Sequence, residues 1–253
     1  MSSSAGTSSA LVTGASRGIG RGIAQELAAR GYGLTITARD GDCLERLAAD
    51  LRTAGAPSVV PVPADLADRA ACGRVVDAHR ERFGSADVLV LAGGVGTAAP
   101  IGELAAHRLD KTFAVNLMSA IALTQAMLPM LRAGAARRHE SGGGGSRVIA
   151  LSSITGVYAE AGLAAYGASK AALGSFMETL NAEESGNGVM ATAIAPGYVA
   201  TDMSAWTSDS ISPSAMLQVS DVVTVVGMLL ELGPNASIPQ IVMSRSGAGA
   251  YRA

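Results

Sequence analysis

The chain has 253 residues, of which 49% are hydrophobic and 16% charged, and this composition excludes a disordered protein. The length suits one large α/β domain or two small ones. A net charge of −2 provides no basic surface for nucleic acid. The two cysteines, Cys43 and Cys72, and the three histidines are scattered, so no metal site is predicted and a reducing, cytoplasmic compartment is expected. We expect residues 1–7 to be a disordered tail and not a signal peptide.

A glycine-rich turn follows the first apolar run. The run at residues 10–12 predicts a buried strand, which enters Thr13-Gly-Ala-Ser-Arg-Gly-Ile-Gly20 and then a helical pattern. A dinucleotide-binding loop requires this strand, turn and helix in this order. Gly14 permits the tight turn, and Gly18 and Gly20 let a phosphate and the helix approach closely.

The second predicted strand, residues 33–38, ends at an alanine followed by Arg39. An acidic residue near this tip would hold the ribose hydroxyl of NAD, but here two guanidinium groups, Arg17 and Arg39, are available. They favour a 2′-phosphate, and hence NADP(H). Asp40 is better placed to cap the next helix. The alternative for Arg39 is a solvent-facing loop residue.

Further polar residues follow the third strand, residues 58–62. Asp65 and Leu66 could meet an adenine ring at the sheet edge. Alternatively, Asp65 or Asp68 caps the helix that ends near Phe83.

The fourth strand, residues 87–91, enters Ala92-Gly93-Gly94. The apolar stretch 112–131 carries Asn116 and other polar residues, so we expect a buried or interface helix and not a membrane span. Asn116 is either a satisfied core residue or part of a polar relay.

Residues 132–146 break the pattern with a run of glycines and predict a flexible surface loop. Within it, Arg137 and Arg138 are either solvated or able to attract an acidic carrier protein.

The candidate catalytic residues lie after this loop. The strand 147–151 ends at Ser152-Ser153, and ligands bind at the carboxyl ends of strands in open α/β sheets. In the helix expected over 162–184, Tyr166 and Lys170 are four residues apart and share one face. A neighbouring ammonium favours the phenolate and lowers the tyrosine pKa from about 10. The alternative is a solvated face on which the pair occurs by chance.

The last third of the chain continues the alternation of strands and helices. A strand at 189–195 leads into Pro196-Gly197, residues 200–213 predict a mobile substrate lid, and a helix at 220–232 precedes a strand at 240–243. The sequence therefore predicts a single domain over residues 8–253, with a doubly wound, Rossmann-type parallel sheet and helices on both faces.

The ordered motifs resemble the short-chain dehydrogenase/reductase family, in its single-domain branch of about 250 residues. The matching positions are Thr13-Gly-x-x-x-Gly-x-Gly20, Asp65, Asn116, Ser153, Tyr166-x-x-x-Lys170, and Pro196-Gly197 with Thr201. Within the family, the chain is most similar to 3-oxoacyl-[acyl-carrier-protein] reductases.

The resemblance implies roles for the catalytic residues. Tyr166 would be the general acid or base, and Ser153, with Ser152 as its rival, would polarise the substrate carbonyl. Lys170 would hold the nicotinamide ribose and lower the tyrosine pKa, while Asn116 would anchor a relay water.

The resemblance also implies an activity and partners. We expect NADP(H)-dependent reduction of a ketone, with 3-oxoacyl thioesters among the candidates, or the reverse oxidation, in a homodimer or homotetramer. The predicted cofactor residues are Gly14, Ser16, Arg17, Gly18, Ile19, Gly20, Arg39, Asp65, Leu66, Ala92, Gly93, Gly94, Tyr166, Lys170, Pro196, Gly197, Val199 and Thr201.

The chain departs from the family pattern at two places. Ala92-Gly-Gly replaces the usual Asn-Ala-Gly, which implies some loss of rigidity, and the C-terminal segment is unusual. These departures support an alternative, a non-catalytic NADP-binding regulatory or scaffold protein. The substrate pocket is expected to be small, largely apolar (Val157, Leu163, Met203, Trp206) and without a fixed charge for an acidic substrate.

Overall fold

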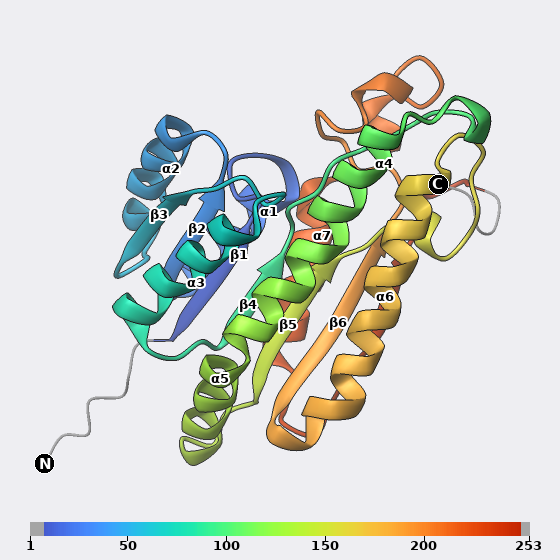
Figure 1. The fold of residues 1–253 in the computed structure, drawn as a ribbon. Coiled ribbons are helices and arrows are strands. Elements are labelled where there is room, and N and C mark those ends of the chain that lie inside the picture. Colours follow the sequence, from blue (N-terminus) through green and yellow to red (C-terminus); the bar gives the residue numbers. More distant parts are fainter. Residues whose placement is uncertain (1–7, 249–253) are drawn as a thin grey trace, which may run out of the picture.

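A computed structural model describes residues 8–248, and its centre is one sheet of seven parallel strands (Figure 1). The strands run in the order β3-β2-β1-β4-β5-β6-β7. Their bounds are β1 Ser9–Thr13, β2 Gly33–Ala38, β3 Val59–Pro63, β4 Val88–Leu91, β5 Ser146–Leu151, β6 Val189–Pro196 and β7 Gln240–Met243. The order reverses between β1 and β4, which opens a crevice at the carboxyl ends of these strands. The predicted Rossmann-type fold is confirmed, while the tail at 1–7 lies outside the described residues.

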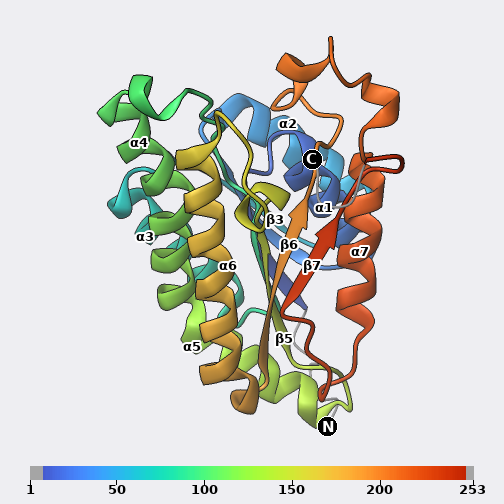
Figure 2. The same cartoon turned by 90° about the vertical axis from the view of Figure 1, so that its right-hand side faces the viewer.

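Helices cover both faces of the sheet (Figure 2). One face carries α1 Gly18–Ala29, α2 Gly41–Thr53 and α7 Val219–Glu231, and the other carries α3 Arg69–Phe83, α5 Ser119–Glu140 and α6 Ala164–Glu184. A shorter helix, α4 Ala106–Phe113, extends α5 toward the carboxyl edge of the sheet.

Alternate residues of a strand pack into two separate hydrophobic cores, one on each face of the sheet. Ala10 and Val12 of β1 pack in the core on the α1, α2 and α7 side, whereas Leu11 packs with α3, α5 and α6. Successive side chains of a strand point to opposite faces, so a strand buried on both faces is apolar throughout. This explains why the central strands appear in the sequence as continuous apolar runs.

The prediction of a flexible loop over residues 132–146 is wrong for most of that range, because α5 continues to Glu140. Side-chain contacts hold the extension in place: Arg132 pairs with Glu184 of α6, and Arg138 donates to Gly144 O at 2.7 Å. Gly134 faces the sheet, where a Cβ atom would lie 2.1 Å from Ala86 O. Glycine at this position therefore serves close packing and not flexibility.

Arg137 is also not a solvated loop residue. Its Nη2 lies 2.6 Å from both carboxylate oxygens of Asp87, which is completely buried and also accepts from the Ser9 N–H at 2.7 Å. A buried carboxylate needs such a partner, because removing the partner leaves an uncompensated charge. The ion pair lies at the amino ends of β1 and β4, at the edge opposite the crevice.

The helical stretch 106–140 is long and apolar enough to cross a membrane by length and composition alone. In this fold half of its most apolar window is buried, and Leu123, Met127 and Leu131 pack in the core under the sheet. The stretch therefore serves as a core layer of the domain, as expected for residues 112–131.

His79 of α3 is fully buried, and its ring faces two oxygens. Its Nδ1 lies 2.9 Å from Thr35 Oγ1 and its Nε2 lies 3.2 Å from Ser85 O. Burial lowers the pKa of His79 from 6.5 to about 4. The imidazole is therefore neutral in the folded protein at pH values where the unfolded chain takes up a proton.

This difference predicts an acid-dependent loss of stability. Because the unfolded chain binds the extra proton, the free energy of unfolding should fall as pH drops below 6.5 toward 4. In His79→Gln, the loss between pH 7 and pH 5 should be smaller than in the wild type by about 2 kcal/mol, measured by urea unfolding. The exposed His107→Gln is the control. An unchanged pH dependence in His79→Gln would contradict the assignment.

Candidate active site at the carboxyl edge

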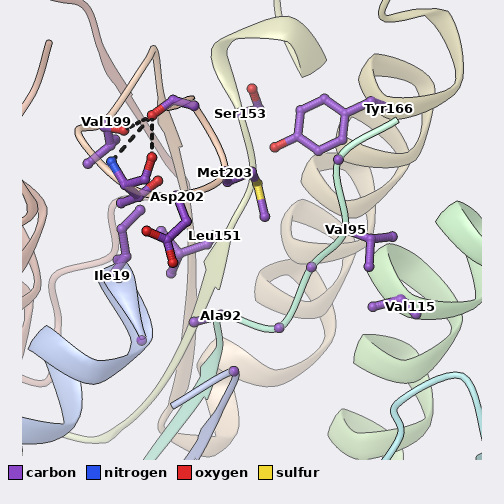
Figure 3. Close-up of a pocket in the computed structure, with 18 of the residues that line it drawn as sticks. Ile19, Ala92, Val95, Val115, Leu151, Ser153, Tyr166, Val199, Asp202 and Met203 are labelled. Carbon is purple, nitrogen blue, oxygen red and sulfur yellow. Dashed lines mark hydrogen bonds between the residues drawn. The ribbon is translucent and has the colours of Figure 1, made fainter. Parts of the chain in front are cut away.

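A cavity of about 890 Å³ lies at the carboxyl edge of the sheet, over the crevice between β1 and β4 (Figure 3). Every residue predicted to bind cofactor lines it, from Gly14 to Thr201, and so does Ser153. Asn116 is the one predicted catalytic residue that does not line it. The topology therefore brings together motifs that are spread over almost 190 positions of the chain.

The glycines of the turn allow backbone segments to pack so closely that a side chain would clash. Gly14 has a φ of +64°, and a Cβ atom there would lie 2.8 Å from Ala92 O. A Cβ atom on Gly20 would lie 2.3 Å from Gly14 O. Helix α1 begins beside this turn, and the unpaired N–H groups and positive dipole at a helix start suit a phosphate. The residues present thus fit the pyrophosphate of a dinucleotide.

The two predicted phosphate-binding arginines lie at the mouth of this cavity. Arg17 pairs with Asp202 at 3.2 Å, and both side chains are more than two-thirds exposed. Arg39 is exposed and follows the tip of β2. Asp40 accepts from the Cys43 N–H at 3.0 Å and caps α2, as predicted. The residue at the tip of β2 is Ala38, so no acidic side chain lies at that position to bind the ribose hydroxyl of NAD.

The helix-cap alternative for the acidic residues after β3 holds for one of them. Asp68, and not Asp65, caps α3, because its carboxylate accepts from the Ala70 N–H at 2.9 Å. Asp65 accepts from the Ala67 N–H and lines the cavity beside Leu66. The contact of Asp65 and Leu66 with an adenine ring stays a prediction.

Ser153 is the serine that faces the tyrosine (Figure 3). Its Oγ accepts from the Thr155 N–H at 3.2 Å and from the Thr155 hydroxyl at 2.9 Å, so its own hydrogen is free to donate toward Tyr166 or a ligand. The rival Ser152 instead donates to Lys170 O at 2.9 Å. Thr155, which sequence reasoning missed, is therefore a positioning residue.

The expected lowering of the tyrosine pKa is not observed. Burial raises the pKa of Tyr166, and the hydrogen bond from Ser153 offsets this only in part. Lys170 Nζ lies 5.7 Å from the centre of the Tyr166 ring, and so sits over the ring. In this state Tyr166 is a protonated phenol at neutral pH.

Lys170 is buried against the carboxyl end of β5. Its Nζ donates to Leu151 O at 2.7 Å. Burial lowers the pKa of Lys170 from 10.5 to about 8. An ammonium held at the floor of the cavity with donors to spare could bind ribose hydroxyls there.

Asn116 lies in a π-helical turn, Ala114–Met118, between α4 and α5. Its side chain accepts from the Val95 N–H at 2.8 Å and donates to Val95 O and Ser169 Oγ, each at 3.1 Å. The amide thus connects the segment after β4 to α6, so Asn116 is a core residue whose hydrogen bonds are satisfied. Its binding of a relay water stays a prediction. Thr13 Oγ1 accepts from the Gly93 N–H at 3.0 Å, so Ala92-Gly-Gly keeps a side-chain anchor.

The substrate end is more charged than predicted. Arg108 and Lys111, one helical turn apart on α4, line the cavity, and so does Glu160 from the loop between β5 and α6. The expectation of a pocket without fixed charge is therefore wrong, and Val157 lies outside the lining. Sequence reasoning missed these residues because two segments that are distant in the sequence, α4 and the loop between β5 and α6, bring them together. Among residues 8–248, no cluster of His, Cys, Asp and Glu could hold a metal ion.

The lid, residues 200–213, is anchored at its base. Val199 forms a β-bridge with Leu217, and Ala200 N donates to Leu217 O at 2.8 Å. Met203 and Trp206 line the cavity from the lid, while Ser204 closes the turn back to Val199 and Thr201. The mobility of the lid stays a prediction.

Comparison with known proteins agrees with this geometry. A family profile described as short chain dehydrogenase matches residues 8–211. The chain is 36% identical to 11-beta-hydroxysteroid dehydrogenase 1A of Arabidopsis thaliana over 196 residues, 76% of this chain and 52% of that protein. It therefore spans about half the length of that curated relative. It is 32% identical to the 3-oxoacyl-[acyl-carrier-protein] reductase of Escherichia coli over 210 residues, 83% of this chain and 81% of that one.

Solved structures share the whole fold. An alcohol dehydrogenase from Thermococcus sibiricus, complexed with 5-hydroxy-NADP, superposes with a TM-score of 0.82 at 26% identity. The match covers 96% of this chain and 98% of that one. Similar structures contain NADP or NADH.

The buried ammonium gives a testable prediction, because Lys170 and Lys111 are the only lysines in the chain. Burial disfavours the charged form, so Lys170 should lose its proton as pH rises through about 8. Selective ¹³C labelling of lysine Cε, followed by NMR titration of the protein without cofactor, should show one signal with this midpoint. Lys111→Arg assigns the two signals. A Lys170 signal that titrates near 10.5 would contradict the buried placement.

Proposed function

Because the chain belongs to the short-chain dehydrogenase family, we propose that it reduces a ketone to a secondary alcohol with NADPH, or catalyses the reverse oxidation, with Tyr166 as general acid or base. The observation that carries this proposal is the Ser153 hydroxyl, which faces Tyr166 with its hydrogen free to donate. Carbonyl reduction needs a proton donor and an oxyanion stabiliser aimed at one oxygen.

The residues divide the work as follows. Ser153 donates a hydrogen bond to the carbonyl oxygen, and Tyr166 delivers the proton to it. The raised pKa of Tyr166 keeps the phenol protonated, which suits the reductive direction. Lys170 orients the ribose and stabilises the phenolate that remains after proton transfer. When bound, the nicotinamide cofactor supplies the hydride.

The preference for NADP(H) is supported by charge at the adenosine end. Arg17 and Arg39 both line the cavity, and Asp40 is occupied in capping α2. The Arg17–Asp202 pair is exposed, and exposed ion pairs contribute little, so a 2′-phosphate can compete for Arg17. Guanidinium groups bind phosphate with two parallel hydrogen bonds.

For the substrate, a 3-oxoacyl thioester is one candidate, supported by the likeness to the Escherichia coli reductase. Arg137 and Arg138 do not support an acidic carrier protein at this site. Arg137 is bound to buried Asp87 at the amino edge of the sheet, and Arg138 binds Gly144 O and Tyr32.

The alternative is a non-catalytic NADP-binding scaffold on the same fold. Only Ala92-Gly-Gly and the unusual C-terminal segment support it. An active enzyme is favoured over a scaffold because all four catalytic positions expected for the family hold the expected residue, namely Asn116, Ser153, Tyr166 and Lys170.

We also propose that the protein forms a homodimer or homotetramer through its two long helices, α5 and α6, and that it is located in the cytoplasm. The dimer or tetramer is supported by Met118, a large apolar side chain that is 54% exposed on the outer side of the α4–α5 junction.

The first prediction concerns Tyr166→Phe, which removes the proton donor and keeps the ring. With NADPH and a ketone panel that includes an acetoacetyl thioester, kcat should fall by a factor of about 10² to 10⁴. Fluorescence titration should show NADPH binding within about threefold of the wild type, because the phenol hydroxyl contributes few cofactor contacts. Wild-type protein that binds NADPH but oxidises none of it with any ketone, and reduces no NADP with alcohols, would support the scaffold instead.

The second prediction concerns Arg39→Ala, which removes one guanidinium from the proposed 2′-phosphate site. The Kd of NADPH should rise about tenfold or more, since a hydrogen bond to a charged group is worth about 1.5–3 kcal/mol. The Kd of NADH should change less than about twofold, because NADH lacks this phosphate. Arg46→Ala, an exposed arginine of α2 outside the cavity, is the matched control. Equal losses for both cofactors would contradict the assignment.

A further inference from the structure

Glu160 and Tyr198 form a polar pair at the substrate end of the cavity. Glu160 lies in the loop between β5 and α6, and Tyr198 follows β6 after Pro196-Gly197. The Tyr198 hydroxyl donates to Glu160 Oε1 at 2.7 Å. Both residues line the same cavity as Ser153 and Tyr166. The pair thus joins two walls of the site through a carboxylate that no motif of the sequence singled out.

This carboxylate has an unused acceptor. Glu160 Oε2 has no hydrogen-bond partner among the described residues, and it is shielded from solvent. An ionised carboxylate offers about four acceptor positions, and a buried acceptor without a donor is costly. If the pair served only to tie two loops, one neutral acceptor for Tyr198 would suffice. The terminal torsion of glutamate is soft, so a small rotation can turn the unused oxygen toward a ligand.

The pair also lies close to the reacting atoms. Burial raises the pKa of Tyr198, with further contributions from the hydrogen bond and charge of Glu160 and from the charge of Tyr166. Tyr166 and Tyr198 line the same cavity, so the two phenols lie in one site. A ligand whose carbonyl oxygen meets Ser153 and Tyr166 would therefore bring its adjacent carbon toward Glu160 and Tyr198.

An aromatic wall completes this corner. The ring of Trp206 packs edge-on against Tyr198, with centroids 6.0 Å apart, and Trp206 remains 61% exposed on the lid. A carboxylate acceptor beside two aromatic rings suits a small hydroxylated molecule better than a bare alkyl chain. Buried acceptors of this kind reject analogues that lack the hydroxyl, because the acceptor is then left unpaired.

We propose that Glu160, held by Tyr198, selects ketones that carry a hydroxyl group on the carbon beside the carbonyl, by accepting a hydrogen bond from that hydroxyl. The inference rests on the proposed ketone reduction and narrows its substrate class. It ranks hydroxy ketones above 3-oxoacyl thioesters, since the latter carry no hydrogen-bond donor beside the ketone. Glu160 is thus a specificity-determining residue.

The kinetic test uses a matched substrate pair, 2-hydroxycyclohexanone and 2-methylcyclohexanone, in which a methyl group replaces the hydroxyl. The wild type should favour the hydroxy ketone in kcat/KM by a factor of about 10 to 100. In Glu160→Gln the ratio should fall to within about threefold of unity, because the charged acceptor is lost. Tyr198→Phe, which releases the carboxylate, should lower the ratio in the same direction. Asp209→Asn, an exposed lid residue outside the cavity lining, should keep the wild-type ratio.

A binding test separates this inference from the proposed reaction. Trp206 is the only tryptophan in the chain, so its fluorescence reports occupancy of this corner. In the presence of saturating NADP, trans-1,2-cyclohexanediol should bind about tenfold more tightly than 2-methylcyclohexanol, and Glu160→Gln should abolish the difference.

The outcomes distinguish the two proposals. If neither ketone is reduced but the Glu160-dependent binding preference is found, the inference stands and the proposed reaction fails. If both ketones are reduced, and the ratio of their kcat/KM values is the same in the wild type and in Glu160→Gln, the reaction stands and the inference is overturned. A binding preference that is absent, or that survives in Glu160→Gln, also overturns it.

Discussion

The site depends on the close docking of α6 against the carboxyl end of β5. Two hydrogen bonds in opposite directions fix this contact: Lys170 Nζ donates to Leu151 O at 2.7 Å, and Ser152 Oγ donates to Lys170 O at 2.9 Å. Glycine makes the approach possible, because a Cβ atom on Gly156 would lie 2.8 Å from the Lys170 backbone. This docking sets Tyr166, one turn earlier on the helix, over Ser153. It also buries the ammonium, so one contact determines both the geometry and the electrostatics of the site.

The two edges of the sheet have different tasks. At the amino edge, the pair of Arg137 with buried Asp87 and the tight packing of Gly134 hold the strands and α5 together. At the carboxyl edge, the reversal of strand order between β1 and β4 leaves a crevice, and Gly14 and Gly20 allow the backbone to turn tightly beside it. Stability and binding are therefore placed at opposite ends of the same strands, and changes at one end need not disturb the other.

The sequence predicts the strands, the glycine turn and the Ser153–Tyr166–Lys170 group well, because each rests on a local pattern or a fixed spacing. It fails where long-range contacts decide. The glycine run at 142–145 favours a loop over the whole stretch, but residues 132–140 continue α5, where Arg132 and Arg137 form ion pairs with distant partners. Glu160 enters the cavity from a loop whose direction no local pattern determines. The pKa of Tyr166 rises because burial outweighs the hydrogen bond from Ser153, and the depth of burial cannot be judged from spacing.

The central claim is that this cavity transfers a hydride from a nicotinamide to a ketone whose oxygen is protonated by Tyr166. The most direct measurement follows the hydride itself, by mass spectrometry of the alcohol formed from 2-hydroxycyclohexanone with NADPH that carries two deuterium atoms on the hydride-bearing carbon of the nicotinamide. The account predicts one deuterium on the former carbonyl carbon of each product molecule, and no labelled product from Tyr166→Phe above a residual rate. Product without deuterium at that carbon, or an equal rate of labelled product from Tyr166→Phe, would contradict it.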